Sequence, residues 1–152
     1  MSHPVPSLSP QADRWLAPLA IALYVWQFHN HGPEPLLQAW EAIATAIWQR
    51  QEPPAAIGIA ALPQRYLTAV PLESPKPTLL PELDLQLAIA RQQAHEPEAI
   101  ALELANLGRQ FGTVILPLHW WRSLPQARLQ FLCRQLGAWQ AGYRQPPMQQ
   151  GV

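Results

Sequence analysis

Charged residues are scarce in this chain. They make up 13% of the 152 residues, whereas an average soluble domain has about 25%. Uncharged glutamines, such as Gln49, Gln51, Gln92 and Gln93, supply part of the missing polar surface. The rest of the deficit is consistent with an apolar face that a partner covers.

Cysteine and long hydrophobic runs are also nearly absent. The single Cys133 excludes an internal disulfide and a cysteine-based zinc site, and it is compatible with a reducing compartment. The longest apolar run, residues 15–26, is shorter than the roughly 20 residues of a membrane-spanning helix. Asp13 and Arg14 stand before this run and no small-residue cleavage site follows it, which argues against a signal peptide. We expect a soluble, cytoplasmic protein without a membrane span.

Acidic residues do not occur after Glu103. Residues 1–103 therefore carry a net charge of −5, and residues 104–152, with five arginines and no acid, carry +5. Either the two parts pack together and neutralise each other, or the basic part binds an anionic partner. The wide spacing of the arginines favours the first interpretation.

Motifs for catalysis or ligand binding are lacking. The glycines are scattered and form no phosphate-binding loop. Cys133 lies on the apolar side of an expected helix, where a buried thiol is inert. His29, His31 and Glu34 are weak candidates for a metal site, because two imidazoles and a carboxylate can hold zinc. Their place in a helix-ending turn favours capping instead, so we predict no metal and no cofactor.

Four segments have the apolar spacing of helices. The first begins with Ser9 as cap and Pro10, ends before Gly32, and is apolar on every side from residue 19 to residue 26, which predicts burial on every side. Pro18 either kinks this helix or moves its start to Leu16. The second covers residues 35–51 and is expected to pair with the first as a hairpin through an apolar face of Leu36, Trp40, Ile43 and Ile47.

The other two helices lie in the second half of the chain. One starts at Glu96 and stops at Gly112, with its buried stripe at Ile100, Leu104, Leu107 and Phe111. The last has Ser123 as its expected cap and runs to about residue 143. Its apolar stripe consists of Leu129, Leu132, Cys133, Leu136, Trp139 and Tyr143.

Short apolar segments between these helices indicate strands. Residues 55–62, 65–72 and 113–118 are expected strands. Residues 83–90 alternate like a strand but follow Pro81-Glu82, which is typical of a helix start; we favour the strand. The predicted fold is α+β, with a small, mainly antiparallel sheet of 3–4 strands covered by four helices in the order α-α-β-β-(β)-α-β-α. Residues 10–144 form the domain, between a proline-rich arm at 1–9 and a tail at 145–152.

The sequence LPLHWWRSLP, residues 116–125, is the best candidate for a contact site. Seven tryptophans are many for one small core, and Trp, Tyr and Arg anchor protein interfaces. Adjacent side chains on an extended backbone point to opposite faces, and in a helix they lie about 100° apart, so in either case we expect one member of the tryptophan pair to be partly exposed. The predicted partner-binding residues are His119, Trp120, Trp121, Arg122, Arg128 and Phe131.

Three function classes are compatible with these features. The favoured one is a non-enzymatic module that binds another protein, as an adaptor, assembly factor or accessory subunit. The alternative is binding of single-stranded nucleic acid or another anionic partner through arginines and aromatic rings of the acid-free third. The second alternative is a small enzyme with a histidine-based site. Association into a homo-oligomer is left open.

Overall fold

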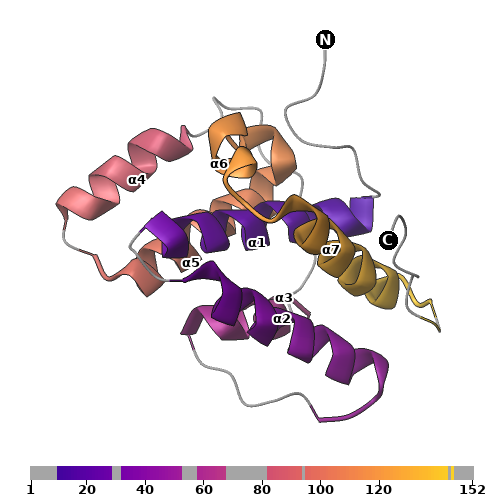
Figure 1. Ribbon diagram of the computed structural model, residues 1–152. Coiled ribbons are helices and arrows are strands. Elements are labelled where there is room, and N and C mark those ends of the chain that lie inside the picture. Colours follow the sequence, from indigo (N-terminus) through magenta and orange to yellow (C-terminus); the bar gives the residue numbers. More distant parts are fainter. Residues whose placement is uncertain are drawn as a thin grey trace.

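The structure is a computed structural model, and it describes residues 10–28, 32–52, 58–67, 82–93, 95–143 and 145. Within these ranges every regular element is a helix and no strand occurs, so the predicted α+β fold with a sheet of 3–4 strands is wrong. Seven α-helices and two 3₁₀ turns make up the described part (Figure 1): α1 Pro10–Phe28, α2 Pro33–Trp48, η1 Gly58–Ala61, α3 Leu62–Leu67, α4 Leu83–Gln92, α5 Pro97–Phe111, η2 Gly112–Ile115, α6 Leu118–Arg122 and α7 Gln126–Gln140.

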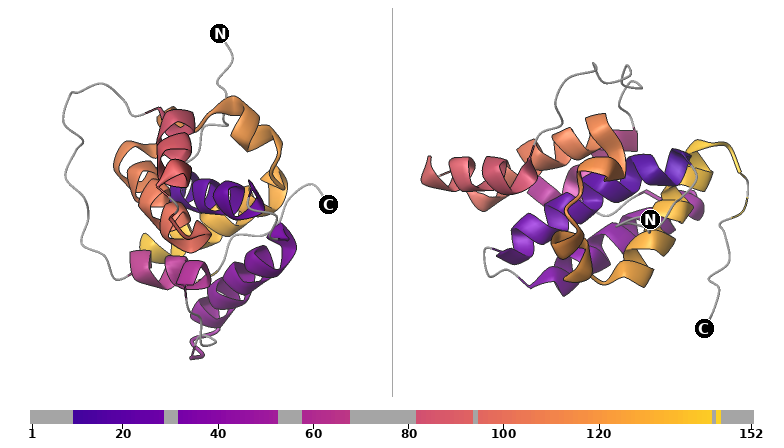
Figure 2. Two further views of the ribbon diagram at one scale, coloured as in Figure 1. Left: turned by 90° about the vertical axis from the view of Figure 1, so that its left-hand side faces the viewer. Right: turned by 90° about the horizontal axis from the view of Figure 1, so that it is seen from above.

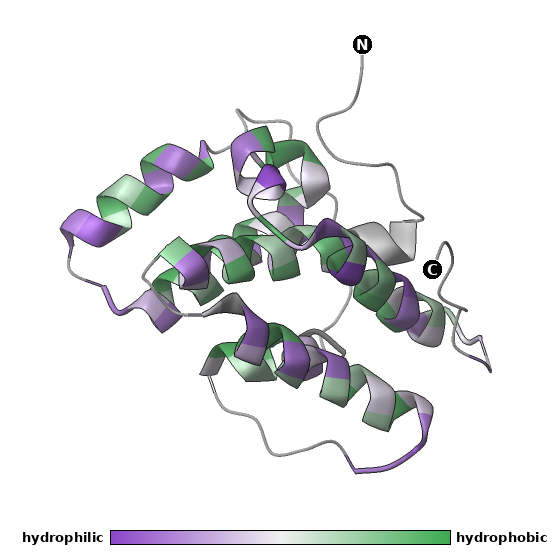
Figure 3. Ribbon diagram, viewed as in Figure 1, coloured by the Kyte–Doolittle hydropathy of each residue, from purple (hydrophilic) through white to green (hydrophobic). Residues whose placement is uncertain are grey.

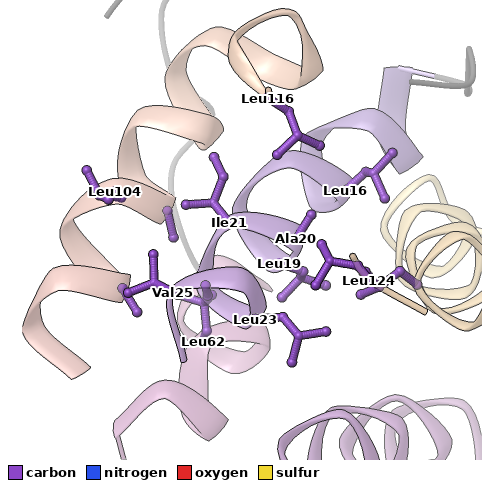
Figure 4. Packing of buried hydrophobic residues seen from close by; sticks show 14 of the residues in the cluster. Leu16, Leu19, Ala20, Ile21, Leu23, Val25, Leu62, Leu104, Leu116 and Leu124 are labelled. Atoms are coloured by element: carbon purple, nitrogen blue, oxygen red, sulfur yellow. The ribbon is translucent and has the colours of Figure 1, made fainter. Parts of the chain in front are cut away.

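Helix α1 is the centre of the molecule. Figure 2 shows it in the middle, with the other helices around it. It packs mainly against α5 and α7, and less against α2, so the expected hairpin of the first two helices is not the main contact. The prediction of burial on every side is confirmed: from residue 19 to residue 26, every side chain is buried or only partly exposed. Figure 4 shows apolar side chains of α1, including Leu16, Ile21 and Val25, pointing toward several different helices.

Helix α1 continues through Pro18, which lies within its bounds. A proline inside a helix removes one backbone donor. At this point α5 crosses α1 very closely. A Cβ atom on Gly108 of α5 would lie 3.1 Å from the backbone nitrogen of Pro18 and 2.6 Å from Cδ1 of Ile21. The absence of a side chain on Gly108 therefore lets the two helices approach this closely.

Helices α2 and α5 follow their predicted apolar faces. In α2, Leu36, Trp40 and Ile43 are buried, and in α5 Ile100 and Leu104 are buried. The α5 boundary at Gly112 is confirmed, because Gly112 is the C-cap. Both helices have a proline in the first turn, where the missing N–H has no partner to lose.

The segments predicted as strands 55–62 and 65–72 are helical where the structure describes them. Residues 58–61 form η1 and residues 62–67 form α3, while 55–57 and 68–72 lie outside the described residues. Pro63 was assigned to the connection between two strands. It is instead the second residue of α3, a position that tolerates proline because its N–H would have no helical partner.

The other two predicted strands are also helical. Residues 83–90 belong to α4, so the helix-start signal of Pro81-Glu82 was the correct indication. Residues 113–118 pass from η2 into the start of α6. Gly112 precedes this apolar segment and ends α5. Pro117 interrupts the segment as the N-cap of α6.

Helix α7 confirms part of its predicted stripe. Leu129, Leu132, Cys133 and Leu136 are buried, but Trp139 is partly exposed, and Tyr143 lies beyond the helix and is exposed. Its N-cap is Pro125 rather than the predicted Ser123. Among the described residues, no helix is both long enough and apolar enough to cross a membrane.

Candidate functional site

The predicted turn His119–Arg122 is part of a short helix, α6. Pro117 is its N-cap, and the Pro117 carbonyl accepts the backbone N–H groups of Trp120 and Trp121 at 3.1 Å each. Ser123 ends this helix instead of starting the next one. Its hydroxyl donates to the Trp120 carbonyl at 2.8 Å.

Both members of the tryptophan pair are buried. Trp120 is 0% exposed and Trp121 is 3% exposed, so the prediction that one of them is partly exposed is wrong. The prediction considered an extended backbone, on which successive side chains point to opposite faces, and also a helix in which one of the two rings is still partly exposed. In a helix the two side chains are separated by about 100° instead, and α6 directs both toward the core.

A carboxylate from α4 joins this short helix. The Trp120 indole Nε1 donates a 2.7 Å hydrogen bond to Oδ1 of Asp84, and His119 Nε2 lies 3.2 Å from the same oxygen. Buried indole N–H groups usually need such an acceptor. Asp84 therefore satisfies Trp120 and also connects α4 to α6.

The ring of Tyr24, in α1, stacks on the indole ring of Trp120. Its ring centroid lies 4.2 Å from that of Trp120, with the two planes 8° apart. Burial raises the pKa of the Tyr24 hydroxyl, and the negative charge of Asp84 raises it further. At neutral pH Tyr24 is therefore a neutral phenol and is not suited to act as a base.

Arg128 connects α7 to α2. Its Nη1 donates to Glu34 Oε2 at 2.6 Å, and its Nη2 donates to Glu41 Oε1 at 2.6 Å. The hydrogen bond from Arg128 lowers the pKa of Glu34, and the two carboxylates raise the pKa of Arg128. At this contact Arg128, from the acid-free part of the chain, neutralises two acids of the acidic part. This agrees with the interpretation that the two parts pack together.

The structure divides the six predicted contact residues. Trp120 and Trp121 are core residues, and Arg128 is held by two carboxylates. His119 and Arg122 are exposed on α6, and Phe131 is partly buried on α7. The contact role of the set stays a prediction, but the tryptophans do not supply an exposed anchor for it.

The weak metal candidates do not form a described site. His29 and His31 lie outside the described residues, and Glu34 is bound to Arg128. In the part of the chain that the structure describes, no group of three or more His, Cys, Asp or Glu side chains is placed to hold a metal ion.

The sequence-based selection missed the outer face of α4. Leu85 is 53% exposed and Ile89 is 40% exposed, and they lie one turn apart on the same side of the helix. Leu83 and Leu87, on the other side, are buried. Helix α4 lies at the edge of the molecule, and its colours alternate between hydrophilic and hydrophobic (Figures 1 and 3). The alternating apolar residues from 83 to 89 indicate this outer face, once residues 83–90 are treated as helical.

No protein-family model, curated protein or solved structure matches this chain.

Proposed function

We propose that this protein acts by binding another protein, as an adaptor, assembly factor or accessory subunit in the cytoplasm. Its docking site is the α4 surface, by which we mean Leu85 and Ile89. The observation that carries the proposal is that α4 is apolar on two faces, of which the described part of the chain buries one. A helix with apolar side chains on two opposite faces can pack against a neighbour on each of them.

Energy considerations support a partner at this face. Full burial of one leucine or isoleucine side chain contributes about 1.5–3 kcal/mol, and a partner would add roughly half of this for each residue, because Leu85 is 53% and Ile89 is 40% exposed. Single exposed apolar residues are normal on protein surfaces, but Leu85 and Ile89 are neighbours on one helix. Such pairs at i and i+4 are the anchors with which helices dock into apolar grooves.

The predicted contact residues of α6 adjoin this surface through Asp84. His119 contacts the Asp84 carboxylate, and Asp84 directly precedes Leu85. His119 extends the docking area as a polar side chain at its border, and Arg122 is exposed about one turn further along α6. Trp120 contributes from the core side, because its indole N–H donates to Asp84 and so helps to fix the position of α4. Arg128 is on the α7–α2 contact and takes no part.

The test is capture of the native complex from source cells with the tagged full-length chain, followed by affinity measurement with the purified partner. We expect the double variant Leu85→Gln/Ile89→Gln to lose the partner while its circular dichroism stays helical. Val114→Gln is the matched control, because Val114 is an apolar side chain that is 65% exposed on η2. It should bind normally. Equal partner affinity for a folded double variant and the wild type would refute the α4 surface.

A further inference from the structure

The α4 surface lies in an acidic segment of the chain. Residues 82–103 contain five acids and one base, a net charge of −4. The acids are Glu82, Asp84, Glu96, Glu98 and Glu103, and all of them are exposed. This segment comprises α4, the connection after it and the first half of α5.

Most of this negative charge is not neutralised within the described part of the chain. Asp84 has His119 as a neighbour, but Glu82, Glu96, Glu98 and Glu103 form no ion pair with another described residue. The one base, Arg91, lies with its guanidinium carbon 4.7 Å from the centroid of the Phe28 ring. The acids of α2 differ in this respect, because Arg128 binds both Glu34 and Glu41.

We infer that the occupant of the α4 surface is a cationic amphipathic helix of another protein, an inference that rests on the proposed function. Leu85 and Ile89 form a short ridge along one helix face, and such ridges pack into the grooves of a second helix. The partner helix has apolar residues toward this ridge and Lys or Arg at its borders. Its positive charges face the acids of residues 82–103, an arrangement that speeds encounter and excludes acidic partners.

Charge also argues against a second copy of this chain at the same face. In a symmetric pair, the same patch of each copy meets the other. Two α4 surfaces would bring together two segments of net charge −4, and like charges across an interface oppose association.

The experiment measures fluorescence anisotropy of three labelled helical peptides with the full-length protein. The peptides have identical leucines at helical spacing and differ only in their bordering residues, which are Lys, Gln or Glu. We expect the lysine peptide to bind about tenfold more tightly than the glutamate peptide, and to lose this advantage as salt is raised to about 1 M. Leu85→Gln should weaken binding of the lysine peptide, and Val114→Gln should leave its affinity unchanged.

A charge variant tests the acids separately from the apolar contact. Glu82→Gln/Glu96→Gln/Glu103→Gln removes three exposed acids that have no ion pair in the described part of the chain. It should weaken binding of the lysine peptide several-fold and leave the affinity for the glutamine peptide unchanged.

The outcomes separate this inference from the proposed function. Equal, Leu85-dependent binding of all three peptides would overturn the cationic occupant and leave the docking surface standing. Absence of Leu85-dependent binding by any peptide would overturn the helical occupant, while the proposed function would still be decided by the native complex. Concentration-dependent self-association that Leu85→Gln abolishes would identify a second copy as the occupant and overturn the inference.

Discussion

The tryptophans act mainly as connectors between segments that are far apart in the sequence. Four indole N–H groups donate across such distances: Trp15 to the Gln140 side chain, Trp40 to the Ile59 carbonyl, Trp48 to the Gln135 carbonyl and Trp120 to Asp84. Each ring supplies a large apolar area and one directed hydrogen bond. This explains how one small protein holds so many tryptophans without exposing most of them.

Gly108 gives a prediction about close helix packing. A methyl group there would meet Ile21 Cδ1 at 2.6 Å and backbone atoms of α1 at 3.1 Å. Overpacking of this kind costs about 1–3 kcal/mol, while the higher helix propensity of alanine returns about 1 kcal/mol. We expect Gly108→Ala to lower the free energy of unfolding by about 1 kcal/mol in urea denaturation.

A second variant isolates the steric cause. Ile21→Val removes the Cδ1 atom, so Gly108→Ala should cost less in that background than in the wild type. A Gly108→Ala protein that is more stable than the wild type would show that α1 and α5 are not in such close contact.

Tyr24 gives a prediction about pH. Its pKa is raised from the ordinary value of 10.0 by burial and by Asp84. Because the folded state holds this proton more tightly than the unfolded state, the resulting stability is complete below pH 10 and is lost as pH rises through the folded pKa. Asp84→Asn removes the charge, so the Tyr24 pKa should fall while remaining above its ordinary value.

The measurement is an ultraviolet titration of the phenolate. Tyr66→Phe and Tyr143→Phe are introduced in both proteins so that Tyr24 is the one tyrosine that titrates. An unchanged Tyr24 pKa in Asp84→Asn would mean that the carboxylate does not act on the ring.

At the scale of the element, α4 shows why alternation can mislead. Residues 83, 85, 87 and 89 are all apolar, which places them on one face of a strand but on two faces of a helix. Local periodicity could not decide between these cases, because the two-sided helix has no single polar side. The acceptor that Asp84 provides for Trp120 depends on contacts between residues 36 positions apart, which no local pattern contains.

The two faces of α4 predict different costs for the same substitution. Leu87 is buried, so Leu87→Ala should lower the free energy of unfolding by about 2–3 kcal/mol. Leu85 is exposed, and Leu85→Ala should change it by less than about 0.5 kcal/mol. Chemical denaturation of the two variants measures the difference. Equal costs would agree with a strand and contradict the helix.

At the scale of the whole molecule, long apolar patterns predicted the helices and their buried residues correctly, and short apolar patterns did not. The faces of α2 and α5, the burial of α1 and most of the α7 stripe follow from apolar spacing over three or more turns. The segments 58–67 and 113–118 are too short for spacing to separate helix from strand, and their prolines and glycines fit both. The candidate site depended on the backbone at Trp120 and Trp121, so an error in local structure reversed their predicted exposure.

During translation, α1 leaves the ribosome long before the helices that bury it. The middle of α1 and the middle of α7 are separated by about a hundred residues, which corresponds to roughly 5–20 s of synthesis. Until then α1 lacks α7, one of its two main neighbours, and exposed apolar surface promotes aggregation. Because α1 is central, part of its apolar surface stays uncovered on the nascent chain until α7, which packs against it, has been made.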